Sequence, residues 1–160
     1  RDRYQSVAAE SVEGGREPTV LMGSVADGVW HAPGQKTFVA RWVEDAGGQY
    51  GLTQEDQNSN VALGLEQVLD HAAQCDLWMM VVHDPDSFTV ADLLAQDPKH
   101  QALLDATDEV WVCNTAHADY FGEVVPHPDW VLEDLMVLME GKEQGPNRLF
   151  ERLRVSIPKP

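Results

Sequence analysis

The stretch LWMMVVHDPD, residues 77–86, decides the fold. Its first six residues are apolar on both alternating faces, which is typical of a strand that is covered on both sides. Residues 110–113, VWVC, have the same character, and the segment between the two has helical features, including a capping box from Thr89 to Asp92. A strand–helix–strand unit of this kind is parallel and right-handed. The sequence therefore predicts a central parallel β-α-β unit in which these two strands are neighbours.

Shorter elements are predicted on either side of this unit. Two early strands should pair antiparallel across a long hairpin, and a third should form a sheet edge; we expect strands at residues 19–25, 37–43 and 120–125. Further helices follow from apolar spacing, the first capped by Asn60 and the second ended by Gly141; we expect helices at residues 61–74, 128–140 and 147–154. The predicted fold class is α/β, with α+β as the alternative: one mixed sheet with helices packed on its faces.

The expected domain organisation is simple. A chain of 160 residues has the size of one domain. We expect a flexible polar arm at residues 1–18, a single globular domain at 19–155 and a tail at 156–160. No apolar run reaches the roughly 18 residues of a membrane span, and no signal peptide is visible. Two isolated cysteines, Cys75 and Cys113, suit a reducing compartment, so the expected location is cytoplasmic.

Charge is the strongest compositional signal. The net charge is −16, and between Trp42 and Gly141 the chain holds 20 Asp and Glu but one basic residue, Lys99. Such a field repels nucleic acid and anionic membranes, and it attracts basic proteins. The short basic cluster of Arg148, Arg152 and Arg154 is too small to follow a phosphate backbone. An acid-rich composition selected for salt tolerance is the alternative explanation.

These charges favour a small binding protein that neutralises a basic protein partner, in the manner of an immunity protein or another inhibitor. Carboxylates would steer the partner, and aromatic side chains such as Trp130 would anchor it, although Trp130 at a helix start can equally well pack on the sheet. The expected partner-binding residues are Asp84, Asp86, Asp119, Tyr120, Asp129, Trp130, Glu133 and Asp134.

The alternative is an α/β enzyme, hydrolytic or metal-assisted. Ligands of open α/β sheets bind beyond the carboxyl ends of parallel strands. Polar residues follow both central strands there, and the candidate catalytic residues are His83, Asp86, His117 and Asp119. However, Asp84-Pro85-Asp86 is also a sequence typical of turns. The pattern of a histidine followed two residues later by an aspartate recurs at His127 and Asp129, away from these strand ends. We therefore expect no cofactor and no tightly bound transition metal.

Overall fold

The computed structural model describes residues 2–10, 17–52, 57–107, 109–120, 122, 124, 126–143 and 149–153. Sheet A contains, in spatial order, β4 (Gln49–Tyr50), β1 (Thr19–Met22), β6 (Leu77–Val82), β7 (Glu109–Asn114) and β8 (Glu151–Arg152). Sheet B contains β2 (Ser24–Ala26), β3 (Val29–Pro33) and β5 (Asn60–Leu63). The helices are α1 (Asp2–Glu10), α2 (Phe38–Asp45), α3 (Leu65–Ala72), α4 (Val90–Gln96), α5 (His100–Ala106) and α6 (Pro128–Met139).

The predicted central unit is confirmed. Strands β6 and β7 are adjacent and parallel, in register from Leu77↔Glu109 to Val82↔Asn114. Strands β1 and β4 continue the parallel set, and β8 pairs antiparallel with β7, so sheet A is mixed. The capping box of Thr89 and Asp92 is present at the start of α4. The α/β class and the single-domain architecture follow from this sheet.

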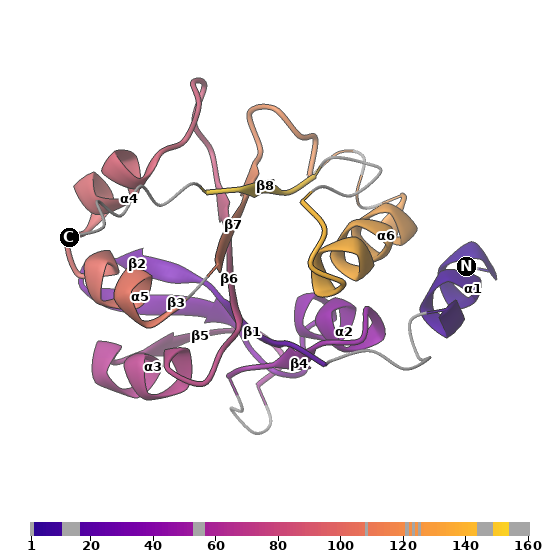
Figure 1. Cartoon of the computed structure of the whole chain (residues 1–160), viewed down its shortest axis with the longest axis horizontal. Helices are drawn as coiled ribbons and strands as arrows, with labels where there is room; N and C mark the ends of the chain where they lie inside the picture. Colours follow the sequence, from indigo (N-terminus) through magenta and orange to yellow (C-terminus); the bar gives the residue numbers. More distant parts are fainter. Residues whose placement is uncertain are drawn as a thin grey trace.

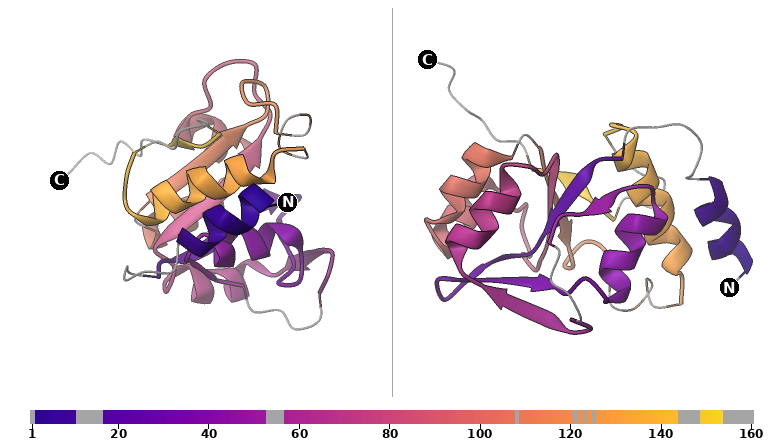
Figure 2. Two further views of the ribbon diagram at one scale, coloured as in Figure 1. Left: turned by 90° about the vertical axis from the view of Figure 1, so that its right-hand side faces the viewer. Right: turned by 90° about the horizontal axis from the view of Figure 1, so that it is seen from below.

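Two layers cover the faces of sheet A (Figure 1). Helices α2 and α6 pack on one face, and α1 lies beyond them against α6, as both views of Figure 2 show. Sheet B and helices α3, α4 and α5 lie on the other face. Because side chains alternate along a strand, Trp78 and Met80 point to the sheet B side, whereas Met79 and Val81 point to the α6 side.

Residues 37–43 were expected to form a strand, and this is wrong because they lie in α2. The alternation of apolar residues there also fits a short helix: Ala40 and Val43, three positions apart, are both fully buried. Thr37 supplies the N-cap, since its hydroxyl accepts a hydrogen bond from Ala40 N at 3.3 Å. The cap residue therefore decides between the two periodicities. The antiparallel hairpin expected here is formed instead by β2 and β3.

The helix expected over residues 61–74 begins later than predicted. Its first part is strand β5, in which Val61 and Leu63 are buried and the intervening positions are exposed. Gly64, not Asn60, holds the N-cap position of α3. Val61, Leu65 and Val68 follow helical spacing across this junction, but Gly64 divides the segment into a strand and a helix.

The last predicted elements also need correction. Among residues 120–125, the described positions 120, 122 and 124 form turns, and the others lie outside the described residues. The helix expected at 147–154 is replaced at residues 151–152 by strand β8; residues 147, 148 and 154 lie outside the described part. Helix α6 and its end at Gly141, which has a φ of +77°, are as predicted.

Gly23 is the residue at which the chain leaves sheet A and enters sheet B. Its φ is +120°, a conformation that only glycine adopts readily, and an added Cβ would lie 2.3 Å from the carbonyl oxygen of His31. Its nitrogen donates to Met79 O at 3.2 Å, and its oxygen accepts from the indole nitrogen of Trp78 at 2.8 Å. This position thereby joins the two sheets.

Candidate functional site

The candidate site lies at the edge of sheet A where its parallel strands end. The carboxyl ends of β1, β6 and β7 share this edge, which is where open α/β sheets bind ligands. Helix α6 follows β7 and starts at the same edge. Helix α2 precedes β4, a strand parallel to β1, so its first residue, Phe38, also lies on this side. Two strand-end loops and two helix starts therefore surround one area.

Asn114 joins the two strand-end loops into one unit. Its amide oxygen accepts hydrogen bonds from the nitrogens of Asp84, at 3.0 Å, and of Ala116, at 3.1 Å. Its amide nitrogen donates to the carbonyl oxygens of Asp84, at 2.9 Å, and of Asp86, at 3.3 Å. The side chain is buried, and all four of its hydrogen-bonding positions are used. The loops after β6 and β7 are thus held in a fixed relation.

The predicted histidines lie in these loops but face different partners. His83 Nδ1 lies 2.9 Å from the hydroxyl oxygen of Thr115, and His117 Nε2 lies 3.2 Å from Pro85 O. The Asp84 carboxylate accepts from Asp86 N at 2.9 Å, and the Asp119 carboxylate accepts from Gly122 N at 2.7 Å, so these two carboxylates make local turn contacts. Within the described part of the chain, none of these contacts joins a histidine to an aspartate.

No three His, Cys, Asp or Glu side chains form a group that can hold a metal ion, among the described residues. The buried thiol of Cys113 contributes no nucleophile, because burial, followed by the nearby charge of Asp134, raises its pKa to about 12. Burial also raises the pKa of Tyr120 to about 12. The described residues of these strand-end loops therefore present carboxylates and two exposed imidazoles but no activated thiol or phenol.

Apolar side chains are exposed at this edge. Phe38 is 67% exposed at the first position of α2, and Val81 is 39% exposed near the end of β6. Val81 is unusual because it lies on a central strand, whose other side chains from Leu77 to Met80 are buried. The α6 face of the sheet is therefore uncovered at its carboxyl end.

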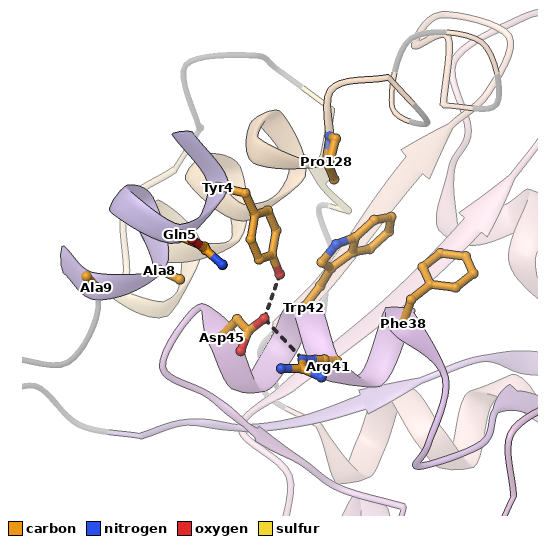
Figure 3. A pocket seen from close by; sticks show the side chains of 9 residues that line it. All are labelled: Tyr4, Gln5, Ala8, Ala9, Phe38, Arg41, Trp42, Asp45 and Pro128. Carbon is orange, nitrogen blue, oxygen red and sulfur yellow. Dashed lines mark hydrogen bonds and ion pairs between the residues drawn. The ribbon is translucent and has the colours of Figure 1, made fainter. Parts of the chain in front are cut away.

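A pocket of about 680 Å³ opens beside Phe38 (Figure 3). Helices α1 and α2 and the start of α6 line it, through Tyr4, Gln5, Ala8, Ala9, Phe38, Arg41, Trp42, Asp45 and Pro128. The Phe38 and Trp42 rings meet edge to face, with 5.0 Å between centroids. Asp45 accepts from the Tyr4 hydroxyl at 2.7 Å and pairs with Arg41 at 3.6 Å. The volume is within the range of small-molecule pockets.

The residues expected to contact a protein partner are largely engaged within the chain. Arg3 pairs with Asp129 at 3.1 Å and with Glu133 at 2.9 Å, which fastens α1 to α6. Asp134 is 1% exposed and accepts from Leu149 N at 2.7 Å. Trp130 is half-buried, and its ring stacks on His127 with 4.3 Å between centroids. Part of the predicted acidic surface is therefore internal structure.

Solved structures of periplasmic binding proteins have a fold similar to that of this chain. A periplasmic heme-binding protein from Pseudomonas aeruginosa has a TM-score of 0.61 and 15% identity over 98% of this chain and 55% of its own. The heme-binding protein RhuT from Roseiflexus sp. RS-1 has a TM-score of 0.58 and 14% identity over 88% of this chain and 52% of its own. A siderophore periplasmic binding protein from Thermobifida fusca has a TM-score of 0.51 and 14% identity, over 88% and 50%.

The chain spans about half the length of each of these structures. No protein-family model matches the sequence, and no curated protein matches it either. In the described ranges, no helix has the length and apolar character needed to cross a membrane.

These neighbours correct the functional expectations. The fold is shared with proteins described as binders of heme and siderophores, which contradicts an immunity-like inhibitor that neutralises a basic protein partner. The periplasmic description of the same neighbours contradicts the expected cytoplasmic location. The net charge was a poor guide because it determines a long-range field and not the local chemistry at the ends of the strands.

Sequence reasoning missed the apolar part of the site. Phe38 was assigned to the face of a strand, and Val81 to the buried centre of β6. A usable signal was the polar run that follows each apolar strand, since Asn114 and Thr115 come directly after β7 as His83 comes after β6.

Proposed function

We propose that this chain is a ligand-binding part of a periplasmic-type solute-binding protein, and that its ligand is a small iron chelate, heme or an iron–siderophore complex. The observation that carries the proposal is the exposed apolar surface of Phe38 and Val81 at the carboxyl-end edge of a sheet whose fold is shared with heme-binding and siderophore-binding proteins. Such proteins close domains around their ligands, so a face that one half leaves open is expected.

The local chemistry supports a flat organic ligand with acidic groups. An exposed phenylalanine next to Trp42 offers the aromatic contact that planar ring systems favour. Lys36 and Arg41 flank Phe38 and both are exposed, and Arg41 pairs with Asp45, so this part of the edge carries basic side chains although the chain as a whole is acidic. Carboxylates of a ligand would be attracted to this part of the edge and repelled by the rest of the surface.

The test is a titration of the full chain with hemin, with iron-free protoporphyrin and with a ferric siderophore. Quenching of tryptophan fluorescence reports the binding of each ligand. Saturable binding of at least one iron chelate at one equivalent is the expected result. Phe38→Ser should weaken it, and Glu66→Gln, an exposed change on α3 that lies on the sheet B side, is the matched control.

Two results would overturn the proposal. One is the absence of saturable binding to any of the three ligands. The other is binding that responds equally to Phe38→Ser and to the control change, since this would indicate nonspecific adsorption of an apolar dye.

A further inference from the structure

We infer that His83 is the protein ligand to the iron of a bound porphyrin, through Nε2, and that Thr115 is the positioning residue that fixes its tautomer. The inference rests on the proposed function and narrows it to heme. It is carried by a chain of hydrogen bonds from His83 through Thr115 to Val82, at the end of β6.

The hydrogen bonds determine which ring nitrogen carries the proton. The Thr115 hydroxyl lies 3.1 Å from Val82 O, and a carbonyl oxygen only accepts, so the single hydroxyl proton is used there. His83 Nδ1 lies 2.9 Å from the same hydroxyl oxygen and must therefore donate to it. In the neutral imidazole the lone pair is then on Nε2, which is the usual arrangement of a metal-ligating histidine.

His83 is also held in place and open to a ligand. The register of β6 and β7 ends at Val82↔Asn114, and Thr115 N donates to Val82 O at 2.8 Å just beyond it. Alternation along the chain then places His83 on the same face as Val81, two residues earlier, which is exposed. The His83 side chain is exposed, and the loop that follows it is bonded to Asn114. An apolar side chain next to an oriented imidazole suits a porphyrin, which presents both an apolar ring and an iron.

A single imidazole matches a metal whose other positions are already filled. A porphyrin supplies four nitrogen donors and leaves the axial positions to the protein, where histidine is a common ligand. A siderophore is itself a chelator that surrounds ferric iron with its own donors. Coordination by His83 therefore distinguishes between the two ligands of the proposed function.

His117 provides a matched control in the neighbouring loop. Pro85 O accepts at 3.2 Å from its Nε2, so the lone pair of His117 is on Nδ1, the opposite tautomer. Both histidines are exposed.

Nitrogen NMR of the ligand-free chain should show opposite tautomers for the two rings. Thr115→Val should remove the tautomer preference of His83 and leave that of His117 unchanged, whereas Thr115→Ser should keep the tautomer preference of His83.

The binding experiment uses hemin with the full chain and follows the Soret band and the electron paramagnetic resonance of the ferric iron. His83→Ala should change the spin state and weaken binding by more than about tenfold, and His117→Ala should leave the spectrum unchanged. Thr115→Val should weaken hemin binding by about tenfold, because loss of a residue that orients a metal ligand typically costs about 10-fold to 100-fold in affinity. Thr115→Ser keeps the hydroxyl and should bind hemin as the unchanged chain does. Circular dichroism confirms that each variant is folded.

The outcomes separate this inference from the proposed function. If hemin binds equally well and with the same spectrum after His83→Ala, the inference is wrong and the proposed function stands. The same holds if the chain binds a ferric siderophore in preference to hemin. If neither chelate binds, the proposed function fails. Independently of any ligand, an NMR spectrum that shows His83 protonated on Nε2 in the ligand-free chain would refute the tautomer assignment.

Discussion

The two faces of β6 differ in how completely they are covered. On the sheet B side, Trp78 is fully buried, lies 5.8 Å from the Trp30 ring and 5.7 Å from the His100 ring, and donates to Gly23 O. On the α6 side, Met79 is buried but Val81, two residues later, is 39% exposed. On the sheet B side Trp78 and Met80 are buried and Val82 is partly buried, so the strand is more completely covered on this face than on the α6 side at its carboxyl end.

This difference separates stability from binding. On the closed face, buried His100 uses both ring nitrogens: its Nε2 accepts from Val25 N at 2.8 Å, and its Nδ1 donates to Leu93 O at 2.9 Å. Substitutions there remove packing and hydrogen bonds together. At the open end, side chains are partly in solvent, so substitutions should change ligand contact and lower the free energy of unfolding by less than those on the closed face.

The largest expected effect is that of Trp78→Ala. Removal of a fully buried indole leaves a cavity and a carbonyl without its donor, so the free energy of unfolding should fall by about 3–5 kcal/mol. Phe38→Ala removes an aromatic ring of the exposed edge and should cost less than about 0.5 kcal/mol. Urea unfolding followed by circular dichroism measures both. Similar losses for the two variants would mean that the faces do not differ as described.

Gly23→Ala should have the next largest effect, because the residue connects the closed face to sheet B. The φ of +120° strains any side chain, and the new Cβ would meet His31 O, so we expect a loss of about 1–3 kcal/mol or more. Gly141→Ala is the control, since its φ is +77° and an added Cβ meets nothing within 4 Å. Thermal unfolding should therefore separate the two, and equal shifts would show that backbone strain alone, without the contact at the sheet junction, accounts for the loss.

The same contrast explains which parts of the fold were predictable. The β6–β7 unit can be predicted from its own residues. Six continuous apolar residues followed by turn residues are typical of a central strand, and neither a surface helix nor an edge strand has that pattern. The segment from Thr37 to Leu63 does not. There a strand alternation and a helical spacing both fit the residues, and the choice depends on Thr37 as a cap and on burial of Ala40 and Val43 beneath α6, which is tertiary information.

The candidate site was predictable only in its polar half. The parallel strands require the loops of His83 and His117 to meet, and they do. Which atoms face each other depends on Asn114 and Thr115, whose contacts cross between strands about 30 residues apart in the chain. Exposure of Phe38 and Val81 depends on where α2 and α6 begin, and no local pattern encodes it.

The smallest of the paired differences, and the sharpest test of the open face, comes from Val81→Ser. Val81 and Val29 are both on strands and are nearly equally exposed, at 39% and 38%, so Val29→Ser on sheet B is a matched control. Both side chains are more than half buried, so each change should lower the free energy of unfolding by a similar amount, about 1 kcal/mol. Of the two valines, Val81 is the one near His83, and further burial of its side chain by a porphyrin would contribute about 1 kcal/mol, or about a fivefold change in Kd.

Hemin titration should therefore show weaker binding for Val81→Ser and unchanged binding for Val29→Ser. Equal affinities for both variants would mean that the exposed end of β6 is not part of the binding surface.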